Sequence, residues 1–156
     1  SSDDRGLNLI KVQKNDFNIG HEISEITSKN QNIGGISTFI GIVRGGNNNS
    51  LNSMTLEHYS GMTEKMLNEI DNEAKERWDL IETKIIHRYG ELFPGDQIVL
   101  VITASEHRKN AIESCQFLID WLKTKAPFWK LEDSTKGKNW VEEKQSDLDA
   151  ASKWKS

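Results

Sequence analysis

The sequence has one cysteine, two prolines and no long hydrophobic run, and these shortages exclude several classes of protein. Cys115 alone can form neither an internal disulfide nor a zinc site built from thiolates. The longest apolar run, residues 98–102, is far shorter than the roughly 20 residues needed to cross a bilayer. No segment resembles a signal peptide, and we therefore expect a cytosolic protein.

The sequence also has fewer basic than acidic residues. The 156 residues include 24 acidic side chains and 20 Lys plus Arg, for a formal net charge of -4 at pH 7, which argues against a general nucleic-acid binder. Hydrophobic content of 35% and charged content of 28% are typical of a globular protein with a polar surface. The length suffices for one domain with a real core, so we predict a single domain over residues 1–156, with residues 1–6 disordered.

Hydrophobic periodicity predicts strands and helices in mixed order. Strands are expected at residues 7–12, 36–44, 51–59, 80–88, 97–103 and 140–141. Helices are expected after N-caps at Asp16, Ser60 and Ser105, and a last short helix at residues 147–154. The loop at residues 45–50 allows strands 36–44 and 51–59 to pair as an antiparallel hairpin. We therefore predict an α+β fold with an antiparallel sheet and packed helices.

Residues 105–130 form a local basic concentration in this acidic chain. His107 and Arg108 fall in the first turn of the predicted helix, where the helix dipole makes cations unfavourable unless an anion is bound. Lys123 and Lys130 flank Pro127 at the other end, and no acid lies between Trp121 and Lys130. A bound anionic small molecule is the simplest explanation of this concentration.

The cations of the predicted helix also have an interpretation without a ligand. Glu106 can offset His107 and Arg108, and both interpretations are open on sequence alone. Lysines in a last helical turn, such as Lys123 and Lys125, complement the helix dipole without any other function.

Two further cations lie outside the helix. Arg44 stands at a strand end beside a Gly-rich loop, where it can clamp a phosphate or carboxylate or can simply be a surface arginine. Lys130 follows Phe128 and Trp129 in an extended segment, with Phe128 and Lys130 on one face and Trp129 on the other. A lysine beside large apolar groups is suited to acid–base chemistry.

Other motifs with known chemistry are absent from the sequence. The histidines have neither metal-ligand spacing nor a neighbouring cysteine, so we expect no metal site and no cofactor; they are His21, His58, His87 and His107. The His87-Arg88 pair at a strand end is expected to serve structure. Cys115 falls on the apolar helix face and is expected to be a buried, unreactive thiol.

Five segments together resemble the family of large, catalytic subunits of molybdopterin synthase. They are GGISTFIGIVR (34–44), LEHYSGMTEKML (56–67), IHRYGELFPGD (86–96), SEHRKNAIESCQFLIDWLKTKAPFWKLE (105–132) and WVE (140–142). The segments occur in family order, and the Lys-Thr-x-Ala-Pro-Phe-Trp-Lys-x-Glu run is the most specific. The chain departs from relatives after Arg44, where Gly-Gly replaces the polar or acidic residue that is frequent there.

The resemblance implies an α/β-hammerhead fold and a sulfurtransferase. The family inserts two sulfurs into cyclic pyranopterin monophosphate to form the dithiolene of molybdopterin, in molybdenum cofactor biosynthesis. The sulfur comes from a thiocarboxylate on the C-terminal glycine of a small ubiquitin-like partner, and two large subunits form a dimer with one small subunit at each end. By matched motif, Lys123 and Lys130 are the catalytic residues. The matched substrate-binding positions are Ile42, Val43, Arg44, His107, Arg108, Leu131 and Glu132.

A second interpretation stays open on the residues alone. A non-catalytic dimeric module that binds a phosphorylated ligand or a partner's C-terminal carboxylate would use the same cations. A pure binder would tolerate arginine at Lys130, whereas an acid–base role would not.

Overall fold

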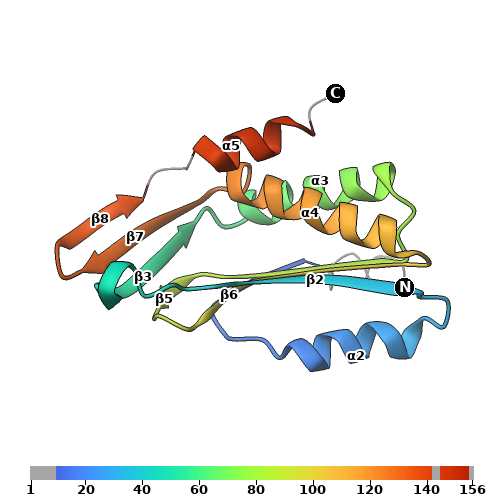
Figure 1. Cartoon of the computed structure of the whole chain (residues 1–156), viewed down its shortest axis with the longest axis horizontal. Helices are drawn as coiled ribbons and strands as arrows, with labels where there is room; N and C mark the ends of the chain where they lie inside the picture. Colours follow the sequence, from blue (N-terminus) through green and yellow to red (C-terminus); the bar gives the residue numbers. More distant parts are fainter. Residues whose placement is uncertain (1–9, 142–144, 155–156) are drawn as a thin grey trace.

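Two four-stranded sheets with helices packed against them make up the fold (Figure 1). The computed structural model describes residues 10–141 and 145–154, so the disorder predicted for residues 1–6 lies outside the described residues. The predicted α+β class is confirmed. Every described pair of strands is antiparallel except β1 (Ile10–Gln13) and β4 (Glu82–Arg88), which run parallel. No helix of the described residues is long and apolar enough to span a membrane.

The first sheet has the order β1-β4-β6-β2, with β6 at Gln97–Ser105 and β2 at Gly35–Ile42. In Figure 1, α2 (Ile19–Lys29) covers one face, and α3 (Met62–Arg77) and α4 (Arg108–Thr124) cover the other. A last helix, α5 (Gln145–Ser152), packs against α4. Leu100 and Ile102 of β6 pack with Ile26 of α2, while Val101 packs with Leu118 of α4. Burial on both faces explains why β6 is almost continuously hydrophobic.

The second sheet has the order β5-β3-β7-β8. Its strands are β5 (Gly90–Leu92), β3 (Leu51–His58), β7 (Phe128–Ser134) and β8 (Gly137–Val141). Met54, Leu56 and Leu92 are buried in one cluster with Val43 and Leu51. β7 begins directly after Pro127, which follows the end of α4. The chain that leaves α4 therefore enters the second sheet at once.

The predicted hairpin between residues 36–44 and 51–59 is wrong. β2 pairs with β6 and β3 pairs with β5 and β7, so the two strands lie in different sheets. The linking segment has positive φ angles of 75° at Gly46 and 56° at both Asn48 and Asn49. It is closed by a hydrogen bond from the Leu51 N–H to the Gly45 carbonyl, 2.9 Å long. These left-handed residues redirect the chain into the second sheet, which a hydrophobic pattern cannot reveal.

The observed N-caps lie one or two residues after the predicted ones. The N-caps are Asn18, Gly61 and His107, in place of the predicted Asp16, Ser60 and Ser105. Asn18 Oδ1 accepts a hydrogen bond of 2.9 Å from the His21 N–H, which satisfies one of the free donors at the start of α2. Ser105 ends β6 instead, and its Oγ accepts a bond of 3.3 Å from the His107 N–H.

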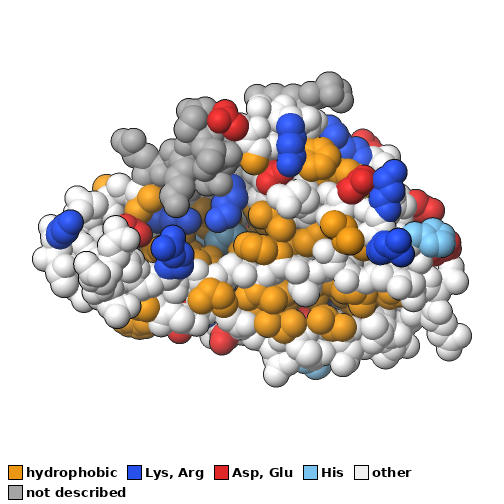
Figure 2. Space-filling view, in the orientation of Figure 1, with side chains coloured by type: hydrophobic (Ala, Val, Ile, Leu, Met, Phe, Trp, Pro, Cys, Tyr) orange, Lys and Arg blue, Asp and Glu red, His pale blue; other side chains and the backbone are white. Residues whose placement is uncertain are grey.

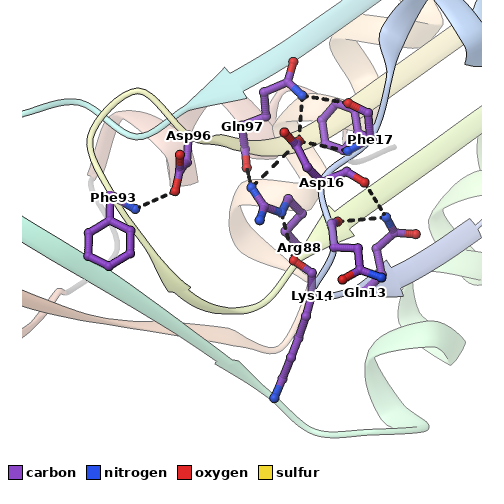
Figure 3. A network of polar contacts seen from close by, with 9 residues as sticks. Gln13, Lys14, Asp16, Phe17, Arg88, Phe93, Asp96 and Gln97 are labelled. Carbon is purple, nitrogen blue, oxygen red and sulfur yellow. Dashed lines mark hydrogen bonds and ion pairs between the residues drawn. The ribbon is translucent and has the colours of Figure 1, made fainter.

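Asp16 belongs to a polar network that ties the chain after β1 to the ends of β4 and β6 (Figure 3). Its Oδ1 accepts hydrogen bonds of 2.8 Å from Gln97 Nε2 and from the Phe17 N–H. The bond from Gln97 is the main reason that the pKa of Asp16 lies below its usual value. Arg88 donates to the carbonyl oxygens of Lys14 at 3.0 Å and Gln97 at 2.9 Å, which fixes the end of β4.

Candidate functional site

Helix α4 carries cationic groups at both of its ends. His107, its N-cap, has extended backbone angles and no capping hydrogen bond from its side chain, and Arg108 follows as the first helical residue. Both side chains are exposed, and the first turn contains no acid. Glu106 Oε1 accepts a hydrogen bond of 2.6 Å from Asn32 Nδ2. The start of α4 therefore presents positive charge to solvent, as an anion-binding surface does.

Two glycines allow the start of α4 to lie directly against β2. A Cβ on Gly34 would overlap the Glu106 carbonyl group, and a Cβ on Gly35 would lie 3.4 Å from the Arg108 Cα. The Gly34 N–H donates a hydrogen bond of 2.9 Å to the Ser105 carbonyl. The absence of two side chains thus determines where Arg108 lies relative to the sheet.

The opposite end of α4 leads into β7. Lys123 is exposed in the last turn of the helix, and Lys125 is its C-cap. The Lys125 ammonium lies 5.0 Å from the centroid of the Trp121 ring, so this lysine packs along the helix. Pro127 then ends the helix as predicted, and β7 starts at Phe128.

Alternation along β7 places Phe128, Lys130 and Glu132 on one face. Phe128 pairs with His58 and Lys130 pairs with Leu56, which is fully buried. Trp129 lies on the opposite face and contacts Tyr59, with ring centroids 4.7 Å apart. The predicted separation of Lys130 from Trp129 is thus confirmed. Leu131 follows on the Trp129 face, paired with Thr55, and both Leu131 and Glu132 are half-buried.

Two histidines lie beside the first residue of β7. The His87 ring is stacked on Phe128 with centroids 3.7 Å apart and planes 14° apart, and the His58 centroid lies 5.7 Å from Phe128. Burial lowers the pKa of His87 to about 4. The positive charges of Lys130 and Lys123 act in the same direction, while a hydrogen bond to the Arg88 carbonyl opposes it. Both predicted catalytic lysines therefore lie near one buried, neutral imidazole.

In Figure 2, Lys and Arg side chains gather near a histidine where β7 meets the end of α4. The sequence-based interpretation gives His87 a structural role and His58 no role, and it does not include the stack of His87 on Phe128. The available signal is alternation: His58 is in phase with the apolar residues Met54 and Leu56 of β3. Arg88, by contrast, has the structural role expected of the pair.

Arg44 lies at the same end of the first sheet as His87. The pairing of β2 with β6 shifts between Gly41 and Ile42, which leaves Ile42 45% exposed and Val43 buried. Val43 is held by backbone hydrogen bonds of 2.9 Å to the Asp96 carbonyl and 2.8 Å from the Gly95 N–H. Arg44 follows as an exposed side chain next to this fixed turn.

The predicted site residues thus form two groups within one chain. Arg44, Lys123 and Lys130 lie toward the end of the molecule that carries His87, with Ile42, Val43, Leu131 and Glu132 beside them in sequence. His107 and Arg108 lie at the other end of α4, and fifteen residues of helix place Arg108 about 22 Å from Lys123. One copy of the chain does not bring all the predicted residues together.

The described residues offer no group of three His, Cys, Asp or Glu that could hold a metal ion. Cys115 is 3% exposed in α4, and burial raises the pKa of its thiol. Its buried position is as predicted, and a thiol in this environment is a poor nucleophile.

Comparison with known proteins gives consistent matches. The model of the family described as "MoaE protein" matches residues 12–125. The molybdopterin synthase catalytic subunit of Escherichia coli is 48% identical over 146 residues, which cover 93% of this chain and 97% of the relative. A solved structure of a molybdopterin biosynthesis MoaE protein from Burkholderia ambifaria is 43% identical, covers 93% of this chain and 96% of that one, and superposes with a TM-score of 0.80.

A more distant structure shares the fold. It is a protein–protein complex of subunits 1 and 2 of molybdopterin-converting factor from Helicobacter pylori, and its matched chain is 20% identical with a TM-score of 0.73. The match covers 87% of this chain and 92% of that chain.

Proposed function

Because the chain belongs to the MoaE protein family, the catalytic subunits of molybdopterin synthase, we propose how its residues carry out sulfur transfer. The substrate is cyclic pyranopterin monophosphate, and the sulfur donor is the C-terminal thiocarboxylate of a small ubiquitin-like subunit. One observation carries the assignment of the reaction centre: Phe128, whose ring stacks on the buried His87, follows Lys123 at the end of α4 and shares one face of β7 with Lys130. The charges of both lysines also act to lower the pKa of His87. Two cations at one place suit two anionic reactants.

The lysines have separate roles in this proposal. In each transfer the thiocarboxylate sulfur forms a bond to a substrate carbon, which loses its bond to an oxygen. Water then cleaves the bond between that sulfur and the acyl carbon and releases the partner's glycine as a carboxylate. Lys130 attracts the thiocarboxylate and stabilises the negative oxygen of the tetrahedral intermediate. Lys123, which is more exposed, assists proton transfer as the cyclic phosphate ring of the substrate opens.

We propose that a second copy of the chain completes the substrate site. β2 is an edge strand of the first sheet among the described residues, and Ile42 and Ile112 are exposed at 45% and 56% beside it. Figure 2 shows hydrophobic side chains in a band across this face. An exposed apolar edge strand favours association.

Antiparallel contact across β2 would unite the two groups of cations. Gly35, at the start of β2, lies against Arg108, while Arg44 follows the end of the same strand. When two copies meet head to tail, His107 and Arg108 of one approach Arg44 and Lys123 of the other. The substrate phosphate and pterin would then be bound by Arg44 from one copy and by His107 and Arg108 from its partner.

The small subunit is proposed to approach from the side of β7. Leu131 and Glu132 continue the strand from Lys130 and are half-buried, and in this proposal they contact the extended C-terminal tail that reaches the lysine. The two-subunit complex of the Helicobacter pylori protein of the same fold supports such a partner. We expect the assembly to be a heterotetramer in the cytosol.

The proposal is tested by mixing the chain with a thiocarboxylated small subunit and the cyclic precursor and measuring dithiolene product. Lys123→Ala and Lys130→Ala are each expected to reduce the rate by about 100-fold or more. Lys125→Ala is the matched control, because this lysine packs on Trp121, and its rate should stay within about twofold of the wild type. Near-normal sulfur transfer by Lys123→Ala or Lys130→Ala would refute the catalytic role of that lysine.

The alternative of a non-catalytic binding module is tested by Lys130→Arg. A site that only binds a carboxylate would keep its affinity for the small subunit and show no turnover in either form. A sulfurtransferase should keep partner binding in this variant and lose most of its turnover, because arginine retains the charge and is a poor proton donor.

A further inference from the structure

His87 of β4 and Phe128 of β7 stack ring on ring. Their centroids lie 3.7 Å apart and their planes are 14° apart, which is a parallel stack. His58 contacts the same Phe128 at 5.7 Å and Tyr89 at 4.6 Å. The first residue of β7 is therefore enclosed by side chains from two other strands.

The orientation of the His87 ring is fixed by hydrogen bonding. Its Nδ1 lies 2.8 Å from the Arg88 carbonyl oxygen, so Nδ1 carries the proton and donates it. The Arg88 side chain in turn binds the carbonyls of Lys14 and Gln97 (Figure 3), which holds this part of the backbone in place. Because burial keeps the ring neutral at physiological pH, His87 packs on Phe128 as an uncharged flat surface.

Phe128 lies between the two lysines in the chain. It lies five residues after Lys123, across the break at Pro127, and two residues before Lys130 on the same face of β7. The segment between helix and strand contains one backbone hydrogen bond of its own, 2.8 Å long, from the Phe128 N–H to the Ala126 carbonyl. The ring stack supplies a tertiary contact to a segment with little local support.

We propose that His87 is a positioning residue, whose ring holds Phe128 and with it the segment that carries Lys123 and Lys130 in the geometry that sulfur transfer needs. This inference rests on the proposed function of the two lysines. Displacements near 1 Å in a catalytic constellation reduce rates by up to about 100-fold. A positively charged side chain at this position would in addition repel both lysines.

Three substitutions distinguish the contribution of the ring stack to activity from the contribution of the imidazole nitrogens. His87→Phe keeps a flat neutral ring, His87→Gln keeps hydrogen bonding without a ring, and His87→Ala keeps neither. The proposal expects kcat of His87→Phe within about threefold of the wild type, and kcat of the Gln and Ala variants reduced by about tenfold or more, with KM for the cyclic precursor little changed. Loss of activity in His87→Phe equal to that in His87→Ala, or full activity in His87→Ala, overturns the proposal.

A double-mutant cycle with Phe128→Leu provides the second measurement. If the stack is the means of positioning, the double variant His87→Ala/Phe128→Leu is no slower than the slower single variant, whereas multiplied losses contradict the proposal.

Trp78→Phe is the matched control for stability, since Trp78 contacts Phe117 edge to face at 5.3 Å on the far side of α4. It should lower the melting temperature and leave kcat unchanged. An inactive wild type would refute the proposed function, while an active wild type with unaffected His87 variants refutes only this inference.

Discussion

Gly34 lies so close to Glu106 that a Cβ on the glycine would overlap the Glu106 carbonyl oxygen and lie 2.9 Å from its carbonyl carbon. The contact joins the start of β2 to the residue before the N-cap of α4. It is a contact between backbone groups, which cannot move aside as a flexible side chain can.

Gly34→Ala is expected to lower the free energy of unfolding by about 1–3 kcal/mol, as overpacking typically does. It should also displace the start of α4 and raise KM for the cyclic precursor, because His107 and Arg108 move with it. Gly20→Ala is the control, since its Cβ would meet its nearest neighbour at 3.5 Å in α2. Urea unfolding and steady-state kinetics measure both effects, and equal stability of the two variants would contradict the prediction.

Cys115→Ala should remain active, because the proposed reaction takes its sulfur from the partner and the thiol is buried in α4. The small cavity is expected to cost about 1–2 kcal/mol of unfolding free energy. The wild-type thiol should react with a disulfide reagent only after denaturation. A well-folded variant that transfers no sulfur would refute this prediction.

His87 makes stability depend on pH in a defined window. Its pKa of about 4 in the folded chain lies below the ordinary value of 6.5, so between these values the unfolded chain binds a proton that the folded chain does not. Stability is therefore unaffected well above pH 6.5 and falls as the pH drops from 6.5 toward 4. Between pH 7 and pH 5 this one group should cost about 2 kcal/mol.

His87→Phe removes this titration. The difference in unfolding free energy between pH 7 and pH 5, measured with urea, should be smaller in the variant by the same amount. Equal pH sensitivity of the two proteins would show that the imidazole is not buried as described.

Lys84 and Glu22 form an ion pair of 2.7 Å in which both side chains are 8% exposed, and it links β4 to α2. Lys84→Met should lower the unfolding free energy by about 3 kcal/mol, since it leaves Glu22 buried without its partner. The double variant Lys84→Met/Glu22→Leu should recover most of this loss. A single variant as stable as the wild type would contradict the prediction, because it would show that Glu22 is not left buried without compensation.

The sequence predicts local structure better than it predicts contacts between residues that are distant in the chain. The two apolar faces of β6 and the break at Pro127 follow from single segments, so both were accessible to pattern arguments. The hairpin failed because left-handed residues at Asn48 and Asn49 send the chain into another sheet. The stack of His87 on Phe128 could not be predicted, because the two residues lie about 40 positions apart in the chain and no local signal reports a contact of that range.

The length of α4 predicts that two inactive variants can complement each other. Since about 22 Å separates Arg108 from Lys123 in one chain, a site built by two copies divides its essential groups between them. A chain with Arg108→Ala and a chain with Lys123→Ala, each inactive alone, should then complement each other when mixed and allowed to exchange subunits. Random pairing would restore about a quarter of the sites, because half of the dimers are mixed and each mixed dimer has one intact site.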